Sequence, residues 1–594
     1  MNSLIKIRNF SIIAHINHGK STLADRFIEI CKNLKLKKYE KQVLDSMDIE
    51  KERGITIKAQ CLTLNYFYKS ENYILNLIDT PGHTDFSYEV NRSLDACEGV
   101  ILLIDITKGI QAQTISNYVK AVEKKLTILV VLNKIDLSSK KDNIKEDIKN
   151  ILNIDAIFEV SAKDGTGVEN LIHVIIDKIP PPLASLSNLF NALIIDAWFS
   201  QYIGVTCIIK VKSGRIFKDE KIYLSFNNKC YKINDLGIFI PEKKFKEFLS
   251  EGEIGFVSFS AKNLEDIKVG TYIHVEAFEV NNFDTANKFL PKIYANIYSI
   301  DPNSFLLLKK ALLKLSLNDS SLVFILQKSQ IFGFGFRCGF LGILHLEVTK
   351  ERLEREYNLE VIITPPNITF KIITNMSKIF YISNPSDLDT ISHIKEIQEQ
   401  IALTTIVSPS QYLGKIIELC VSSRGKQFDI KHVNDKVYLK YYIPLNELIF
   451  NFYSQLQTLS NGYASFDYII SGYVVSNLNK LTILINEKKI DALEFIIHKD
   501  KIRKVSLDLI EKIKNVIPKH LFEIKIQAAI GKKIIAKGVI KALKKNVLSK
   551  CYGGDITRKK KLLEKQKLGK KKLKKIGNIN IPHDAFIKIM DFKN

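Results

Sequence analysis

The first candidate for chemistry is a phosphate-binding loop that reads Ala14-His15-Ile16-Asn17-His18-Gly19-Lys20-Ser21. It follows an apolar, strand-like run and leads into a helical stretch. Backbone N–H groups of such a loop and of the helix N-terminus point at phosphate oxygens. The Lys20 ammonium would neutralise those oxygens, and the Ser21 hydroxyl would bind Mg²⁺. The residues expected to line this site are Asn17, His18, Gly19, Lys20, Ser21 and Thr22.

Four further motifs predict that the phosphates belong to a guanine nucleotide. Asp79 ends a second apolar strand and would hold Mg²⁺, which Thr56 would also reach when GTP is bound. In Asn133-Lys134-Ile135-Asp136, the Asp136 carboxylate can accept the N1 and N2 hydrogens of guanine, which adenine does not offer. Ser161-Ala162-Lys163 would supply a backbone donor to the guanine O6. The order of the motifs therefore predicts GTP and GDP as ligands.

Hydrolysis of GTP needs a group that orients the attacking water. His83 follows Asp79-Thr80-Pro81-Gly82 and is the candidate, because imidazole can donate or accept a hydrogen bond and titrates near neutral pH. The alternative is a turn histidine without a catalytic role. The arginines of this region are few: Arg8, Arg26, Arg53 and Arg92. No arginine finger is evident among them, so we expect an external activator.

These motifs need a parallel sheet to position them, because several of them follow strand-like runs. The runs are Phe10–Ala14, Tyr73–Ile78, Val100–Ile106 and Leu126–Leu132. Continuous apolar character is typical of parallel strands buried on both faces. Helical stretches lie between the runs, which predicts an α/β doubly wound domain over 1–184. Three prolines at 180–182 end it.

The rest of the chain divides into further units. Short strands with turn signals over 187–282 predict a β-barrel. Strands alternate with helices over 288–368, and a similar two-layer pattern recurs over 395–480, which predicts two small split-βαβ domains. The helix expected in the second of them runs over Leu445–Thr458. The last segment, 481–594, is strongly basic, so the predicted fold class is multidomain α/β and α+β with a barrel.

The net charge of +23 indicates a polyanionic partner, nucleic acid or an anionic membrane. Only 11 of the 87 basic residues are arginine, so a lysine-rich composition from AT-rich coding is the alternative for the charge as a whole. The stretch 541–576 holds 15 Lys or Arg against two acids. A solvated helix face could carry this charge, but we expect the segment to be loose until it meets a phosphate backbone.

Composition excludes other classes. Mean hydropathy is near zero, and no apolar run approaches the roughly 20 residues that span a bilayer. No leader peptide is expected before the strand that begins near Phe10. The eight cysteines form no CxxC pair, which disfavours a zinc site or a disulfide framework and favours a reducing cytoplasm.

Several sequence blocks carry a resemblance to a known family. They are 8–26, 44–60, 79–105, 315–322 (LSLNDSSL), 332–357, 462–468 (GYASFDY) and 546–577. They resemble the translational GTPases and, within them, the LepA family, also called elongation factor 4. The block 546–577 is the most discriminating, because elongation factor G lacks it. Only 24 residues separate Asp136 from Ser161, which leaves no room for the insert in the G domain of elongation factor G.

The resemblance implies five domains. These are a G domain (1–184), a β-barrel domain II (187–282), a ferredoxin-like domain III (288–368), a ferredoxin-like domain similar to elongation factor G domain V (395–480), and a basic LepA-specific C-terminal domain (481–594). It implies a cytoplasmic monomer that uses GTP and Mg²⁺, contacts ribosomal RNA and tRNA on the 70S ribosome, and associates peripherally with the inner membrane. Its activity would be one-codon back-translocation of tRNAs, as a fidelity factor under stress. Ribosomal RNA would place His83 beside the water, within a gate formed by Ile16 and Ile55.

Two positions depart from the family pattern. Asn17 replaces an Asp, which removes a negative charge near the phosphates, and Asn461 replaces a basic residue before GYASFDY. Three alternative functions stay open at this stage: a GTP-timed binding switch in ribosome assembly or initiation, an elongation factor G-like translocase, and a membrane-surface GTPase.

Overall fold

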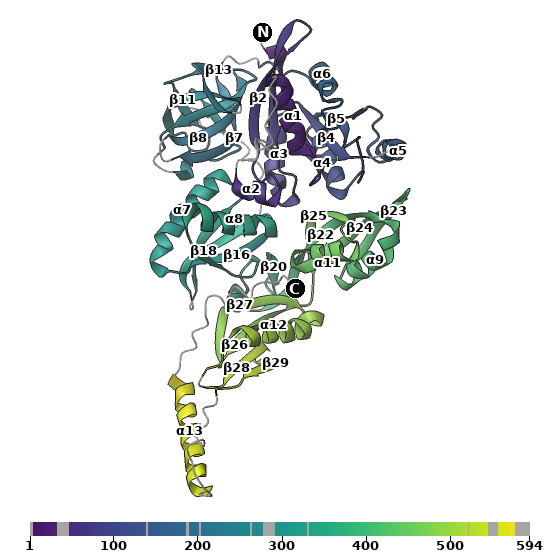
Figure 1. Cartoon of the computed structure of the whole chain (residues 1–594). Coiled ribbons are helices and arrows are strands. Elements are labelled where there is room, and N and C mark those ends of the chain that lie inside the picture. Colours follow the sequence, from purple (N-terminus) through teal and green to yellow (C-terminus); the bar gives the residue numbers. More distant parts are fainter. Residues whose placement is uncertain are drawn as a thin grey trace.

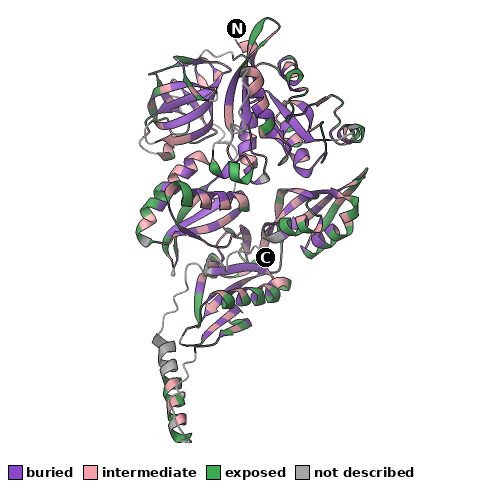
Figure 2. Cartoon of the chain, in the orientation of Figure 1, coloured by how far each residue is buried: buried purple, intermediate pink, exposed green. Residues whose placement is uncertain are grey.

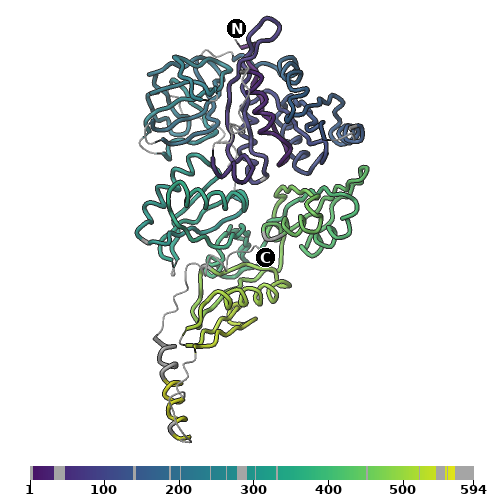
Figure 3. The backbone as a smooth tube through the Cα atoms, in the orientation of Figure 1, coloured from purple at the N-terminus to yellow at the C-terminus, as the bar shows by residue number. Residues whose placement is uncertain are grey.

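The computed structural model describes residues 4–32, 47–137, 141–185, 189–200, 203–240, 242–261, 264–276, 291–329, 332–520, 522–543 and 556–576. Five sheet-based units follow one another along the chain (Figure 1). The first two lie side by side at the top of the view, the third and fourth lie below them, and the fifth is at the bottom (Figure 3). Each unit has a buried interior (Figure 2), and one hydrophobic cluster joins the third unit to parts of the fourth and fifth.

The first unit is a doubly wound α/β domain, as the sequence predicts. Its sheet has the order β2-β3-β1-β4-β5-β6, and every strand but β2 pairs in parallel. Helices cover both faces, because the apolar residues of β1 and β4 point alternately into two separate hydrophobic clusters. The strands are β1 (Ile7–Ala14), β2 (Gln60–Tyr68), β3 (Glu71–Asp79), β4 (Gly99–Asp105), β5 (Thr127–Asn133) and β6 (Ile157–Glu159). The helices are α1 (Lys20–Lys32), α2 (Asp48–Arg53), α3 (Ser87–Asp95), α4 (Ala112–Glu123), α5 (Lys141–Leu152) and α6 (Val168–Lys178).

The second unit is a closed β-barrel. Strands run in the order β10-β15-β7-β8-β14-β11-β12, and a pairing of β10 with β11 closes the ring. Closure removes the free edges that an open sheet would expose. The strands are β7 (Asn191–Ser200), β8 (Gly204–Ser213), β10 (Lys221–Leu224), β11 (Cys230–Ile240), β12 (Glu242–Phe245), β14 (Ile254–Phe259) and β15 (Tyr272–His274). A small sheet of β9 (Arg215–Phe217) and β13 (Phe248–Ser250) accompanies it.

The third and fourth units have ferredoxin-like βαββαβ topology. In the third, the order β17-β18-β16-β19 places the first strand of the motif in the middle of the sheet. Its elements are β16 (Ile293–Ser299), α7 (Phe305–Asn318), β17 (Val323–Ser329), β18 (Gly333–Phe340), α8 (Ile343–Tyr357) and β19 (Val361–Ile363). The fourth has β22 (Ile394–Pro409), α9 (Leu413–Ser422), β23 (Lys426–Val433), β24 (Lys436–Pro444), α11 (Tyr453–Leu459) and β25 (Ser465–Val475). Its sheet continues into β20 (Phe370–Thr374) and β21 (Ile379–Ile382).

The helix expected over Leu445–Thr458 is not continuous. A short α10 (Leu445–Glu447) passes into a π-helical turn over Leu448–Phe452 before α11 begins. Leu445, Leu448, Phe452 and Leu456 are all buried along this interrupted helix.

The fifth unit is an antiparallel sheet covered by one helix. The order is β27-β26-β28-β29, and α12 packs on it through Leu509, Ile510 and Ile513. The elements are β26 (Leu478–Ile485), β27 (Lys488–His498), α12 (Ile502–Val516), β28 (Ile524–Ile530) and β29 (Lys533–Ile540).

The basic segment forms a helix, α13 (Ile556–Ile576), which projects away from the five units (Figure 1). The expectation of a loose segment is wrong for these residues, because lysine and leucine are both good helix formers. The remainder of the charged stretch, 544–555, lies outside the described residues. Among the helices that the structure describes, none is long and apolar enough to cross a membrane.

Candidate active site

The loop after β1 has the backbone shape that phosphate binding needs. Asn17 and Gly19 both have positive φ, 65° and 93°. Glycine and asparagine adopt this conformation most readily, so both residues fit the loop. A Cβ at Gly19 would lie 2.4 Å from Asn133 Nδ2, so there is no room for a side chain there. Thr22 is exposed at the start of α1.

Four side chains meet beside this loop: Lys20 and Ser21 from α1, Asp79 from the end of β3, and Thr56 from the segment between α2 and β2. Lys20 Nζ donates to Asp79 Oδ1 at 2.7 Å and to Thr56 Oγ1 at 3.1 Å. Ser21 Oγ lies 3.5 Å from Thr56 Oγ1. Asp79 is fully buried, and its Oδ2 has no hydrogen-bond partner among the residues described. The structure therefore brings together the three residues that the sequence assigns to Mg²⁺.

The base-recognition motifs are tied to the phosphate loop. Asn133 Nδ2 donates to the His18 carbonyl at 2.8 Å, and its Oδ1 accepts from the Ala162 N–H at 2.9 Å. Lys134 Nζ donates to the Asn17 carbonyl at 2.8 Å and pairs with the Asp105 carboxylate at 2.7 Å. Asn133 and Lys134 therefore hold the loop and the base pocket at a fixed separation.

Asp136 lies at the rim of this pocket, exposed, with Ser161 Oγ donating to its Oδ1 at 2.8 Å. Ile135 beside it is half-buried, and Lys163 is exposed. Arg26 Nε donates to the Ala162 carbonyl at 2.8 Å, so α1 also supports the 161–163 turn. A carboxylate that keeps one oxygen open suits recognition of neighbouring ring N–H groups.

His83 lies apart from the base pocket, in a cleft of about 1400 Å³. The loop residues His15, Ile16 and Asn17 line the same cleft, as do parts of α8, β24 and the 461–468 segment. Asn461 is among them, and its amide donates to the Tyr412 hydroxyl at 3.3 Å. The cleft is therefore shared by three units of the chain.

A glutamine that no sequence pattern singles out bridges the loop and Gly82, the residue before His83. Gln113 donates to the Gly82 carbonyl and lies 2.6 Å from His15 Nδ1 through its Oε1. Since the amide oxygen accepts, His15 carries its proton on Nδ1. Gly82 in turn packs against the backbone of Ala14 and Ile16.

The loop histidines carry no charge at neutral pH. Burial lowers the pKa of His18 to about 3 and also lowers the pKa of His15. His18 is fully buried, so it contributes its backbone rather than its ring to the phosphate loop. The positive charge facing the phosphates therefore comes from Lys20.

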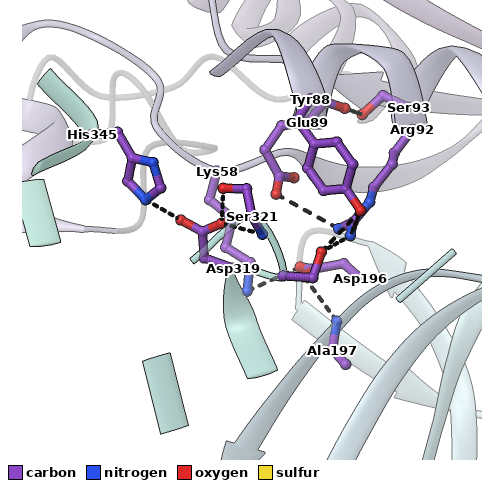
Figure 4. Close-up of polar contacts among 11 residues, drawn as sticks. Lys58, Tyr88, Glu89, Arg92, Ser93, Asp196, Ala197, Asp319, Ser321 and His345 are labelled. Atoms are coloured by element: carbon purple, nitrogen blue, oxygen red, sulfur yellow. Dashed lines mark hydrogen bonds and ion pairs between the residues drawn. The ribbon is translucent and has the colours of Figure 1, made fainter. Parts of the chain in front are cut away.

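The helix that follows His83, α3, lies at a junction of the first three units (Figure 4). Arg92 of α3 donates to the hydroxyls of Tyr88 and of Ser320 in the third unit. Lys58 pairs with Asp196 of the barrel at 2.9 Å and lies 5.1 Å from the ring centre of Trp198. Next to Ser320, Asp319 forms a 2.7 Å ion pair with the buried His345. The segment LSLNDSSL thus contributes to this junction.

Among solved structures, a protein from Thermus thermophilus has a similar fold. The alignment has a TM-score of 0.58, 15% sequence identity, and covers 79% of this chain and 97% of that chain. At this identity the likeness concerns the fold alone.

Family models match three successive parts of the chain. The elongation factor Tu GTP binding domain matches residues 5–181, and the elongation factor G C-terminus matches 396–484. The GTP-binding protein LepA C-terminus matches 485–591. The chain belongs to the LepA-type translational GTPases. It therefore binds guanine nucleotide and is a GTP hydrolase, in a family whose members act on the ribosome.

Sequence reasoning missed several residues that support the LepA-type site. Glu50 is fully buried, and its Oε1 accepts from the N–H groups of Ile57 and Lys58, at 2.9 Å and 3.1 Å. It thereby fixes the segment that carries Thr56. Glu50 stands in a charged stretch, so no apolar pattern marks it as buried. Asp85 and Gln113 also make hydrogen bonds at the site that no sequence pattern indicates.

Proposed function

We propose that this LepA-type chain hydrolyses GTP when it is bound to the 70S ribosome and moves tRNAs one codon backwards. The observation that carries the proposal is the position of His83. It lies in a cleft beside the phosphate loop, and the walls of that cleft come from three different units. A site of this kind can be completed by an external partner that enters the cleft.

The residues beside the phosphate loop fit a Mg²⁺ ion. Mg²⁺ prefers carboxylate, hydroxyl and phosphate oxygens, and the buried Asp79 Oδ2 is an acceptor without a partner in the described structure. The Lys20 ammonium already places positive charge between Asp79 and Thr56. Ser21, Thr56 and Asp79 would hold the ion, which would neutralise charge on the β and γ phosphates when bound.

The chain's own groups explain most of the hydrolysis step. Lys20 and the loop N–H groups bind the phosphates and fix the γ-phosphate in place. The Asp85 N–H donates to His83 Nδ1 at 3.0 Å, so the neutral ring carries its proton on Nε2. That Nε2–H would orient the attacking water. Ribosomal RNA in the cleft would bring the ring to the γ-phosphate, which is the stimulation we propose.

The C-terminal region supports the RNA partner. Helix α13 contains eleven Lys or Arg and one Glu over 21 residues. Charge of one sign at this density attracts a polyanion with strong salt dependence. Ribosomal RNA and tRNA are the polyanions that a ribosome-bound factor meets. Association with the inner membrane surface would draw on the same charge.

The decisive measurement is the GTP turnover of the purified protein with and without 70S ribosomes. We expect ribosomes to accelerate turnover by about 10³- to 10⁵-fold, the range of GTPase activators. His83→Ala should lose the acceleration and keep its affinity for GTP. His432→Ala is the matched control, because His432 is exposed on β23 and lies outside the cleft. Ribosome binding without acceleration would contradict the proposed ribosome-stimulated hydrolysis and favour a GTP-timed binding switch.

Back-translocation is tested separately by toeprinting of post-translocation ribosomes. We expect the protein with GTP to shift the ribosome one codon towards the 5′ end of the message. A forward shift on pre-translocation ribosomes would instead indicate an elongation factor G-like translocase. Accumulation of small-subunit precursors in cells that lack the protein, without any shift in the toeprint, would indicate an assembly role.

A further inference from the structure

Helix α8 of the third unit lacks a cap from its own sequence. The first N–H groups of a helix have no partner within the helix and usually bond to the side chain of the N-cap residue. Here the N-cap residue is Gly342, which has no side chain, and the first turn contains no acid.

The missing acceptor comes from the first unit. Asp85 Oδ2 accepts from the Leu344 N–H at 2.9 Å, across 259 positions of sequence. A carboxylate at this end of a helix also interacts favourably with the helix dipole. Asp85 is buried, 7% exposed, so water competes little for this contact. The side chain of Asp85 is therefore fixed by α8.

The backbone of the same residue fixes His83. The Asp85 N–H donates to His83 Nδ1 at 3.0 Å, which sets both the tautomer and the orientation of the ring. Together the two contacts form a continuous chain from the N-terminus of α8 through Asp85 to the imidazole. A shift of α8 would therefore move the ring of His83.

The contact is too close to tolerate added volume. An ideal Cβ at Gly342 would lie 2.1 Å from Asp85 Oδ1. The backbone of Gly342 is extended, with φ of −176°, so an alanine could adopt it without strain. Space for the carboxylate, rather than backbone conformation, is thus what requires glycine at this position.

The same helix also binds the segment that carries Thr56. Arg355 of α8 makes two hydrogen bonds to Glu52 of α2, at 2.9 Å and 2.8 Å. Arg53 of α2 lies 2.9 Å from Glu351. Val348 of α8 packs in an apolar cluster with Ile57. Helix α8 is therefore in contact with both nucleotide-facing segments.

We propose that Asp85 is a positioning residue for His83, and that it acts by capping helix α8 so that the third unit controls the placement of the ring. This inference rests on the proposed catalytic role of His83. It gives the third unit, which contributes no residue to the nucleotide motifs, a role in hydrolysis.

The test compares steady-state kinetics of ribosome-stimulated GTP hydrolysis in four variants. Asp85→Ala should lower kcat by about tenfold to a hundredfold, the cost of misplacing a catalytic group by about 1 Å, with little change in KM for GTP. Asp85→Asn should keep most of the activity, since asparagine caps helices about as well as aspartate. Gly342→Ala should resemble Asp85→Ala. The double variant Asp85→Ala/Gly342→Ala should be no slower than either single variant, because without the carboxylate the new methyl group displaces nothing.

Several outcomes would overturn the inference. One is an Asp85→Ala variant with normal kcat while His83→Ala has lost stimulation. Another is an Asp85→Asn variant as slow as Asp85→Ala, which would make charge rather than capping the cause. A third is a lower unfolding temperature in Asp85→Ala and Gly342→Ala with kcat unchanged at saturating ribosomes, which indicates a structural role only. If Asp85→Ala does not fold, Gly342→Ala decides alone, because it retains every catalytic side chain. A normal His83→Ala variant would instead contradict the proposed function.

Discussion

Lys20 and Asp79 form a buried ion pair at the centre of the nucleotide site, with 2.7 Å between Lys20 Nζ and Asp79 Oδ1. The lysine is 8% exposed and the aspartate is fully buried. In the protein without nucleotide, each charge is therefore compensated mainly by the other. The pair keeps both groups in place until phosphates and a cation bind.

Removing only the lysine should destabilise the nucleotide-free protein. We expect Lys20→Met to lower the free energy of unfolding by about 3–5 kcal/mol, because it leaves the Asp79 carboxylate buried and unpaired. The double variant Lys20→Met/Asp79→Asn should recover most of this loss while still failing to bind GTP. Urea unfolding measures the first effect and nucleotide titration the second. A double variant as unstable as the sum of the two single variants would contradict the pairing.

Asp136 should determine the choice of base. In Asp136→Asn the amide presents one donor and one acceptor, which no longer matches the two hydrogens of guanine but suits the C2 carbonyl and N1–H of xanthine. We expect the affinity for GTP to fall by a factor on the order of 10⁴, and the affinity for xanthosine triphosphate to rise. Ser161→Ala is the control for the orientation of the carboxylate: it loses the 2.8 Å hydrogen bond to Asp136 but keeps the acceptor pair. It should lose affinity for GTP without gaining affinity for xanthosine triphosphate.

The Asp319–His345 pair should make stability depend on pH. Burial by itself would lower the pKa of His345, but the Asp319 carboxylate, helped by Asp85 and Glu89, raises it. Burial by itself would raise the pKa of Asp319, but the His345 imidazolium lowers it. Asp319 contributes stability above its unfolded pKa near 3.9 and loses it as the pH falls. His345 contributes stability below its unfolded pKa near 6.5 and loses it as the pH rises through the higher folded value.

The pair should therefore stabilise the protein most between about pH 4 and pH 6.5. We expect the difference in unfolding midpoint between wild type and His345→Gln to be largest in that window and to shrink towards pH 9. Thermal melts across the pH range measure it. A constant difference for His345→Gln would mean that the histidine packs without being charged.

The basic C-terminus should control affinity for the ribosome and leave nucleotide binding unchanged. Truncation after Gly554 removes α13. We expect weaker ribosome binding and a shallower dependence of log K on log salt, by about 0.7–0.9 for each phosphate that the protein no longer neutralises. Ribosome pelleting at several salt concentrations checks this, and an unchanged slope would contradict the assignment of α13.

Flotation with anionic vesicles after RNase treatment distinguishes binding to lipid from binding to RNA. Binding that persists after RNase would support a membrane-surface role.

The sequence predicted the composition of the nucleotide site because each motif follows from fixed chemistry. Phosphates need a glycine-containing loop and a lysine, and guanine needs a carboxylate, so Lys20 and Asp136 could be selected without a structure. Periodicity likewise predicted the doubly wound sheet and both ferredoxin-like units. It did not predict the π-helical turn at Leu448–Phe452, because the buried residues Leu445, Leu448, Phe452 and Leu456 recur at the spacing of an ordinary α-helix.

Contacts between units could not be predicted in the same way. Asp85 caps a helix 259 positions away, and this depends on how two units pack rather than on local pattern. Glu50 and Gln113 have the same character: each is a polar residue whose role comes from the backbone groups that surround it. For α13 the local helix propensity of lysine and leucine outweighed the repulsion on which the expectation of a loose segment rested.

The junction of Lys58 with the barrel has a practical consequence. The protein contains one tryptophan, and that residue is Trp198. Its ring lies against Lys58, which follows directly after the segment that carries Thr56. Its emission is therefore an intrinsic optical signal from a single place in the molecule, so rearrangement of that segment on nucleotide exchange can be followed in real time without attaching a dye.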